Sequence, residues 1–379
     1  MKFDCYGLSD CENGGQCFQQ IGNCPEKMMC ACPPCFYGMR CQFSTSGFGL
    51  SLDAILGYHI QPQTNIIHQA SIVQLSVALT IIIIVVGLIN GILSMITFKN
   101  KIIREVGCGL YLLGSSITTL LAVIIFGLKF LILLLAQMSL IQNRFFLDFQ
   151  CRSIDFILRI CLYMDQWLNS CVASERAITI IKGARFSKTK SKRTAKLIIV
   201  ILLILTIGTN IHDPIYRRLI DEENDNKNRI WCIVTYPSKL QTYYFIMQIF
   251  HFFAPFLINL ISVIILITKK SHQQANIRTH QTYKQILRKQ FQEHKHLIIA
   301  PIILIILAVP RLIISFASKC MKSTNDSWLF LIGYFISFIP PTLTFVIFIL
   351  PSKFYKKEFR RTVNQYTTNI RRRIQSISV

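Results

Sequence analysis

Long apolar runs separated by short polar segments make up most of the chain. A helix needs about 20 residues to cross the hydrocarbon core of a bilayer, and seven runs reach or approach that length. They cover roughly residues 72–98, 107–136, 151–175, 195–212, 241–268, 297–318 and 328–350. The pattern predicts an all-α membrane protein, built as a bundle of seven transmembrane helices.

Composition and charge agree with a membrane protein and predict its orientation. Hydrophobic residues make up 52% of the 379 positions and charged residues 16%, at a net charge of +23. Most lysines and arginines follow the first, third and fifth runs or lie in the tail after the seventh, and such basic segments stay on the cytoplasmic side. We therefore expect a multi-pass plasma-membrane protein with its N-terminus outside and its C-terminus in the cytoplasm. The basic excess reflects topology and suits membrane lipid headgroups; nucleic acid is not an expected partner.

Eight of the fourteen cysteines lie within the first 41 residues, which indicates disulfides and an oxidising compartment. Spacing alone would allow 105 pairings, and a metal site is the disfavoured alternative because no histidine interleaves the cysteines. The stretch "CENGGQC" followed by "CACPPCFYGMRC" resembles an epidermal growth factor (EGF)-like module. The resemblance implies the disulfides Cys5–Cys17, Cys11–Cys30 and Cys32–Cys41, which leaves Cys24 to pair with Cys35.

These observations divide the chain into four parts. Residues 1–42 are the small disulfide-rich β (EGF-like) module, 43–70 an extracellular linker, 71–350 the bundle, and 351–379 a cytoplasmic tail with a short amphipathic helix. No signal-peptide apolar region precedes the module, so either the first span acts as a signal anchor or the true start is missing.

The third apolar run carries a cysteine near one end and an arginine near the other. Cys151 lies at its outer start and Arg176 at its inner end, 25 residues later, which is about 37 Å along a helix. Cys232, in the loop after the fourth run, is the expected disulfide partner of Cys151. This arrangement resembles the rhodopsin-like (class A) G protein-coupled receptors, whose third helix has that disulfide outside and an Asp/Glu-Arg-Tyr triplet inside. The triplet here is Glu175-Arg176-Ala177, without the tyrosine.

The resemblance implies a switch at the inner end of this helix. Glu175 would hold Arg176 in the inactive state, and release of Arg176 would let it project toward a heterotrimeric G protein. The alternative is an interfacial pair that only anchors the helix.

Other family positions are matched in part. Asn90 matches the first-helix asparagine, and Pro255 and Pro310 match the fifth- and sixth-helix prolines, about which a helix can kink. The usual tryptophan before Pro310 is missing, and "TFVIF" at 344–348 stands where Asn-Pro-x-x-Tyr is expected.

Asp165 places an acid near the middle of the third span. The family holds a sodium-binding aspartate in the second helix, where this chain has Thr118 or a neighbour. We hypothesise that the acid has moved to Asp165 and forms a cation or proton site with Thr118, Thr119 and Asn169. A neutral buried acid, hydrogen-bonded to the same groups, is the alternative. No other metal site is expected.

Charged residues near the outer ends of the spans are candidates for the ligand pocket. Arg152, Asp155 and Arg159 recur at i, i+3 and i+7 on one helical face. Arginines from different helices favour an anionic or carboxylated ligand, because guanidinium binds carboxylate bidentately. An internal Asp155–Arg159 pair is the alternative. The remaining candidates come from the fifth and sixth spans: Gln248, His251 and Arg311.

The segment from 212 to 240 predicts a β-hairpin, because apolar and charged residues flank the turn-prone "EENDN". Such a hairpin is common among peptide receptors of this family, so a peptide is the expected ligand. The leading hypothesis is therefore a G protein-coupled receptor. The alternatives are an adhesion protein that works through the EGF-like module, and a transporter or channel, against which the missing inverted repeat counts. No catalytic constellation is present in the sequence, so an enzyme is not expected.

Overall fold

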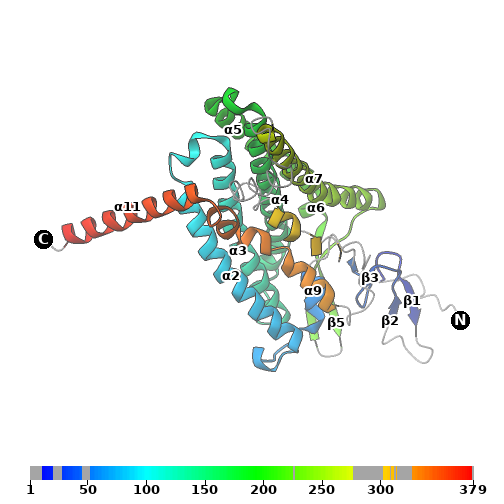
Figure 1. Cartoon of the computed structure of the whole chain (residues 1–379). Helices are drawn as coiled ribbons and strands as arrows, with labels where there is room; N and C mark the ends of the chain where they lie inside the picture. The colour runs from blue at the N-terminus through cyan, green and yellow to red at the C-terminus, as the bar shows by residue number, and fades with distance from the viewer. Residues whose placement is uncertain are drawn as a thin grey trace.

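The computed structural model describes residues 11–19, 28–44, 52–224, 227–275, 302–307, 309–310, 313 and 327–377. Long helices form the body of this part of the chain, and Figure 1 shows the N-terminal strands and the C-terminal helix on opposite sides of it. The long helices of the body are α2 (Ser71–Phe98), α3 (Gly107–Gln137), α4 (Arg144–Lys182), α5 (Lys188–Asn210) and α7 (Ser238–Ala275).

Four stretches of the described residues are long and apolar enough to cross a membrane, judged by length and composition. They are Ser71–Phe98, Gly107–Gln137, Lys188–Tyr216 and Lys239–Lys269. Between 22% and 50% of the positions in their most apolar stretches are buried, and many of their aliphatic side chains are exposed, as expected of helices whose solvent is lipid. The predicted sixth span lies mostly outside the described residues, so a complete seven-helix bundle is not shown.

The predicted seventh span is broken into short pieces. An α-helix, α9 (Ser327–Ile336), is followed by α10 (Ile339–Thr342) and a π-helical turn at Phe345–Ile349. Pro340 and Pro341 lie inside α10. Proline has no backbone N–H and its ring clashes with the preceding turn, which explains why the apolar run does not continue as one helix.

Helix α4 is the central element and is longer than the predicted 151–175. It packs against α3, α5 and α7. The side chain of Asn143 caps its first turn by accepting a hydrogen bond from the Phe146 backbone N–H at 3.2 Å, and the helix ends before Gly183, whose φ is +50°. The charged residues of α4 make it less hydrophobic than its neighbours. Charged side chains in a membrane need partners inside the protein, so α4 is stabilised by such partners rather than by lipid.

Two hydrophobic clusters fill the two ends of the helical body. One contains Trp231, Phe126 and Phe338, and the other contains Phe98, Trp167 and Phe348. The first lies at the end that carries the Cys151–Cys232 disulfide, and we call it the disulfide end. The second lies at the end that carries Arg176, and we call it the basic end.

A two-stranded sheet covers the disulfide end. Strand β5 (Arg217–Asn224) pairs antiparallel with β6 (Lys227–Val234), with Leu219 opposite Cys232. The predicted hairpin is thus confirmed. A short helix, α6 (His212–Tyr216), connects α5 to it. The disulfide joins Cys151 of α4 to Cys232 of β6 at a Cα–Cα distance of 5.6 Å.

The N-terminal residues form a small disulfide-linked β unit. Strands β1 (Gln16–Gln19) and β2 (Met28–Ala31) pair antiparallel, as do β3 (Phe36–Tyr37) and β4 (Phe43–Ser44). Disulfides join Cys11 to Cys30 and Cys32 to Cys41, as the EGF-like pairing implied. Cys17 and Cys35 are also disulfide-bonded, while their expected partners, Cys5 and Cys24, lie outside the described residues.

The stretch expected to be an extracellular linker packs into the disulfide end. It forms α1 (Leu52–Leu56) and the 3-10 turns Gly57–His59 and Ile66–His68. Leu52, Ile55 and Leu56 are at most 1% exposed. Apolar residues at i, i+3 and i+4 in "LDAIL" form one helical face, and this face is buried against the bundle.

The basic end carries a long terminal helix, α11 (Lys353–Ile377), where a short amphipathic helix was predicted. Two further 3-10 turns, Ile103–Glu105 and Gly183–Arg185, lie in loops. Glu358 of α11 accepts a hydrogen bond from Asn100 at 3.0 Å, and Tyr355 packs edge-on against Phe98. Phe354 is 51% exposed, so it lies outside the packed face that Tyr355 occupies.

Candidate functional site

A buried lysine in α3 lies at the centre of the disulfide end. Lys129 is 1% exposed. Its Nζ lies 2.8 Å from Oδ2 of Asp53 in α1 and 3.2 Å from Oδ2 of Asp155 in α4. The ammonium group therefore joins the N-terminal segment to two helices. A charge buried this deeply needs such partners, because burying it unpaired would cost several kcal/mol.

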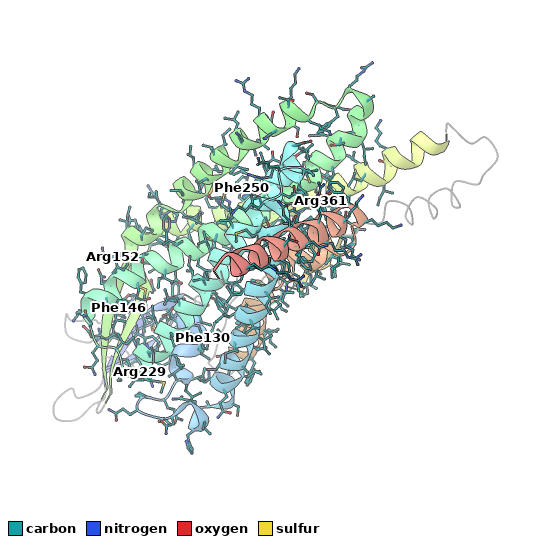
Figure 2. The ribbon with its side chains drawn as sticks, turned by 90° about the vertical axis from the view of Figure 1, so that its left-hand side faces the viewer. Phe130, Phe146, Arg152, Arg229, Phe250 and Arg361 are labelled. Atoms are coloured by element: carbon teal, nitrogen blue, oxygen red, sulfur yellow. A yellow bond between two sulfur atoms is a disulfide. The ribbon has the colours of Figure 1, made fainter. Side chains whose placement is uncertain are left out.

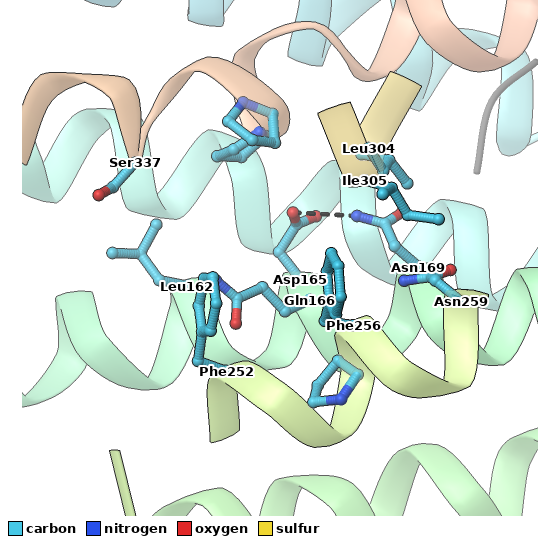
Figure 3. Close-up of a pocket in the computed structure, with 13 residues that line it drawn as sticks. Leu162, Asp165, Gln166, Asn169, Phe252, Phe256, Asn259, Leu304, Ile305 and Ser337 are labelled. Carbon is cyan, nitrogen blue, oxygen red and sulfur yellow. Dashed lines mark hydrogen bonds between the residues drawn. The ribbon is translucent and has the colours of Figure 1, made fainter. Parts of the chain in front are cut away.

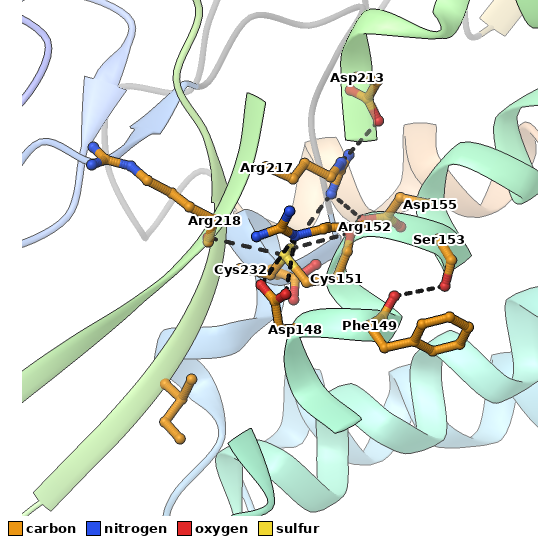
Figure 4. Close-up of a disulfide and its surroundings, with 12 residues drawn as sticks. Asp148, Phe149, Cys151, Arg152, Ser153, Asp155, Asp213, Arg217, Arg218 and Cys232 are labelled. Carbon is orange, nitrogen blue, oxygen red and sulfur yellow. Dashed lines mark hydrogen bonds and ion pairs between the residues drawn. A yellow bond between two sulfur atoms is a disulfide. The ribbon is translucent and has the colours of Figure 1, made fainter. Parts of the chain in front are cut away.

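The same cluster continues into the hairpin. Arg217, at the start of β5, binds Asp155 through Nη1 at 2.6 Å and Asp213 through Nε at 2.8 Å (Figure 4). Asp213 also contacts Nη1 of Arg159 at 3.4 Å. Three cations, Lys129, Arg217 and Arg159, thus alternate with three carboxylates, which are Asp53, Asp155 and Asp213.

A tyrosine provides a further hydrogen bond to Asp213. The hydroxyl of Tyr236 donates a hydrogen bond to Asp213 Oδ1 at 2.5 Å. Burial, with Tyr244 and Asp213 nearby, raises the pKa of Tyr236, so the hydroxyl stays protonated and remains a donor. The cluster, which we call the charge cluster, therefore runs from α1 to the chain just after the hairpin.

The structure distributes the predicted row of α4 charges among different partners. Arg152 is exposed and pairs with Asp148 one turn earlier, at 3.1 Å. Asp155 binds Lys129 and Arg217, and Arg159 binds Asp213 and lies over the Tyr244 ring at 5.1 Å. The Asp155–Arg159 pair, considered as the alternative to a ligand pocket, is replaced by contacts to other elements. Arg152 lies nearest the helix end, where its side chain reaches solvent, so it does not belong to the charge cluster (Figures 2 and 4).

The other predicted pocket residues lie in the packed interior or outside the described residues. His251 is fully buried: Trp167 Nε1 donates to its Nδ1 at 3.0 Å, and its Nε2 lies 2.8 Å from Thr209 Oγ1. Gln248 is 6% exposed. Arg311 lies outside the described residues. His251 thus joins three helices rather than lining an open site.

The sequence interpretation missed most of the charge cluster. Lys129 is the one charged residue between 107 and 136, and an ionisable residue within an apolar span marks a functional position by default. That signal could have found Lys129. Nothing in the sequence indicated that Asp53, Asp213 and Arg217 would meet it, because they lie far apart along the chain.

A second polar site lies midway along α4. Asp165 is 2% exposed. It accepts hydrogen bonds from Ser115 at 2.5 Å, from Thr119 at 3.4 Å and from Asn169 at 3.1 Å. Thr118, the α3 residue expected here, donates to the Ser115 backbone carbonyl instead, because it lies on another face of the helix.

A cavity of about 70 Å³ adjoins Asp165. It is lined from α4, α7, the 302–307 stretch and the α9–α10 region (Figure 3). Asn259 contributes a buried Oδ1 that has no hydrogen-bond partner among the described residues. Asn90 does not reach this site, since its amide donates to the Val86 carbonyl of its own helix. Pro255 lines the cavity from inside α7, and Pro310 lies in the helical stretch 309–310.

At the basic end, Glu175 and Arg176 point to different partners. Glu175 accepts a hydrogen bond from the Ser191 hydroxyl of α5, and the same hydroxyl accepts one from the Gly107 backbone N–H at 2.9 Å. The Arg176 guanidinium lies 5.4 Å from the centre of the Phe348 ring. Arg176 also interacts with the side chains of Cys108 and Tyr355. The expected direct Glu175–Arg176 pair is therefore replaced by contacts to separate partners, because adjacent residues of a helix project about 100° apart.

Taken together, apolar helices of membrane-spanning length and a helix-to-hairpin disulfide define a multi-pass helical membrane protein. The family of 7 transmembrane receptors (rhodopsin family) matches residues 89–348, and the chain belongs to this family. Members are multi-pass plasma-membrane receptors that signal through G proteins in response to extracellular ligands. No curated protein matches the chain.

Proposed function

We propose that this receptor binds a peptide or another carboxylate-bearing ligand at the disulfide end and activates a heterotrimeric G protein at the basic end. The disulfide end, with the N-terminus, faces the exterior, and the basic end with α11 faces the cytoplasm. The basic loops and the disulfides support this orientation. The hairpin and the charge cluster support a peptide carrying carboxylates, because arginine and lysine recognise that group.

The observation that carries the signalling role is the arrangement of Glu175 and Arg176. Glu175 is held by Ser191 from α5, and Arg176 faces Phe348 in the π-helical turn of the last span. Both contacts join α4 to a different element, and neither is a buried ion pair. A ligand that binds more tightly to a state in which these contacts separate would shift the population toward it and expose Arg176 to the G protein.

We further propose that Asp165 takes part in a sodium site. Its neighbours offer oxygen ligands from Ser115, Asn169 and Asn259, and such hard donors suit a hard cation. The adjoining cavity of about 70 Å³ has room for a small ion with water. The neutral, hydrogen-bonded acid is the alternative.

We propose that residues 1–42 form an EGF-like module and that residues 43–70 connect it to the bundle. Its alternative role, as an adhesion domain with a passive bundle, is less well supported. Arg218 of the hairpin binds Glu12 of the module at 3.0 Å, and Phe43 packs edge-on against Trp231 at 5.0 Å. These contacts join the module to the hairpin that covers the charge cluster, so the module is positioned to act with the bundle.

The first test is nucleotide exchange on a panel of G proteins in cells that express the wild type or Arg176→Ala, without ligand and with a peptide library. We expect exchange by the wild type that Arg176→Ala reduces, because its guanidinium is the proposed G-protein contact. Arg185→Ala, an exposed arginine, is the matched control and should stay near the wild type. Silence of the wild type across the panel, with the protein at the cell surface, would contradict the proposal and favour adhesion through the module.

A further inference from the structure

Residues 52–60, which we call the tethered segment, occupy the outer mouth of the bundle. Leu52, Ile55, Leu56 and Ile60 are at most 1% exposed and belong to the hydrophobic cluster of the disulfide end. The segment packs on α9 through α1. In this family the mouth is the expected entrance for a ligand, so the chain's own segment lies where a ligand would have to bind.

The hairpin holds the tethered segment in place. The Arg229 guanidinium donates to the backbone carbonyls of Gly57 and Ile60 at 3.4 and 3.3 Å. Trp231 packs so closely on Gly57 that a Cβ at this position would overlap the indole ring. These contacts fix the backbone of the segment and thereby direct Asp53 toward Lys129.

Asp53 is the only acidic residue in the segment, and it balances the charge cluster. Three cations and three carboxylates are present while Asp53 is in place. Without it, Asp155 and Asp213 would face Lys129, Arg159 and Arg217, and one positive charge would be left uncompensated in a buried site. Such a site attracts an anion, because an unpaired buried charge costs several kcal/mol.

The surroundings of Lys129 contain further unused recognition groups. The amide oxygens of Gln137 and Gln150 are buried and have no hydrogen-bond partner among the described residues. Together with Asp53 and Lys129 they line a cavity of only about 10 Å³. This is about the space of one water, so no ligand fits beside Asp53. A ligand that replaced Asp53 would find one cation and two hydrogen-bond acceptors.

We infer that Lys129 is the carboxylate-binding residue of the ligand site and that Asp53 occupies it as a stand-in for an acidic group of the ligand. The inference rests on the proposed receptor function and names the chemistry of its site. The displacing group is a carboxylate with neighbouring N–H donors, as in an acidic peptide, because the N–H groups would satisfy Gln137 and Gln150. Its entry moves the tethered segment out of the mouth.

The test is chemical rescue of the full-length receptor, purified in lipid nanodiscs. Asp53→Ala removes the carboxylate and opens space beside Lys129. We expect its unfolding temperature to fall below that of the wild type. Sodium acetate should then raise it by about 2–4 °C relative to sodium chloride at equal ionic strength, since a ligand that binds only the folded state stabilises it. N-acetylglycine, which adds an N–H to the carboxylate, should act at lower concentration than acetate.

Two controls make the rescue specific. The wild type and Asp148→Ala, which loses an exposed carboxylate that pairs with Arg152, should not respond to acetate. Adding Lys129→Met to Asp53→Ala should abolish the response. If Asp53→Ala does not fold, Asp53→Ser, which keeps a hydrogen-bonding group and still leaves space beside Lys129, should show the same rise with either carboxylate.

An equal acetate effect on wild type and Asp53 variants, or none on any of them, would overturn the inference. Rescue that persists without Lys129 would also overturn it. The unfolding temperature is measured without a G protein. A negative result would therefore not affect the nucleotide-exchange test of the proposed function. Conversely, a receptor that is silent toward G proteins could still show the rescue.

Discussion

The two ends of this receptor bury charge in opposite ways. At the disulfide end, six charged side chains alternate in sign and bind one another across α1, α3, α4, α6 and β5. At the basic end, the buried Glu175 accepts a hydrogen bond from a hydroxyl, and the buried Arg176 lies beside an aromatic ring and the side chains of Cys108 and Tyr355. The other basic residues between 182 and 196 are mostly exposed.

The difference separates an end held by paired charges from an end held by weaker contacts. Each ion of the alternating cluster has partners on other elements, so removing one leaves a buried charge behind, at a cost of several kcal/mol. A hydrogen bond to a charged group contributes about 1.5–3 kcal/mol, and a desolvated cation over an aromatic ring contributes about 2 kcal/mol. We therefore expect the contacts of Glu175 and Arg176 to separate at a smaller cost than those of the charge cluster.

The largest effect is expected from Asp213→Asn. It removes one charge from a site where Arg159, Arg217 and Tyr236 converge, and the two arginines remain. We expect a loss of about 3–5 kcal/mol in the free energy of unfolding. Thermal unfolding of the purified receptor measures it. Asp221→Asn removes a carboxylate from the exposed pair with Arg144 and should cost less than about 1 kcal/mol. Equal losses in the two variants would show that the buried cluster is not a rigid unit.

A smaller effect is expected at the basic end from Glu175→Gln. The amide binds Ser191 less strongly than the carboxylate does, so the contact between α4 and α5 weakens. We expect ligand-free nucleotide exchange to rise by about tenfold, which corresponds to a change of about 1.4 kcal/mol in the balance of states. The matched control is Glu105→Gln, because Glu105 is exposed. Unchanged or reduced exchange in Glu175→Gln would argue that this contact does not restrain the active state.

A few-fold effect is expected from Asp165→Asn, which tests the sodium site between the two ends. Wild-type exchange should fall when sodium replaces choline at constant ionic strength, because the ion would stabilise the inactive packing around α4. The asparagine variant should lose this dependence, as it lacks the carboxylate charge. Thr118→Ala is the control, since Thr118 bonds only its own helix. Sodium dependence that survives in Asp165→Asn would leave the neutral acid as the explanation.

The smallest effect is expected from Arg152→Ala. Its guanidinium and its partner Asp148 are both exposed, so solvent screens the pair. The free energy of unfolding should change by less than about 0.5 kcal/mol, and acetate rescue of Asp53→Ala should be unaffected when the two changes are combined. A large loss would instead show that Arg152 contributes to stability as the residues of the charge cluster do. It would then contradict the expected difference between exposed and buried ion pairs.

Hydropathy and local spacing predicted much of the fold. The bounds expected for α2 and α3 each differ from the structure by one residue at one end, and the hairpin after α5 was recognised from its turn-prone centre. The Cys151–Cys232 link followed from the position of each cysteine at an outer end. The burial of the tethered segment was missed, because "LDAIL" is too short to stand out in a polar stretch.

The candidate sites were predicted less well than the elements that carry them. Asp165 with Asn169 was expected from spacing along one helix, and the structure adds Ser115 in place of Thr118. The partners of Asp155, Arg159 and Glu175 were all assigned to near neighbours in the chain. The structure gives each of them a partner from another element.

The sequence by itself determined which segments enter the membrane, because the free energy of transferring a helix into lipid is a sum over its own residues. It also predicted that the basic loops lie on one side and the disulfide-forming cysteines on the other. Only the tertiary structure decided which charge meets which, because Asp53, Lys129, Asp155 and Arg217 are brought together by packing rather than by spacing. A buried charge takes whichever opposite charge the fold places within reach, and no local pattern records that choice.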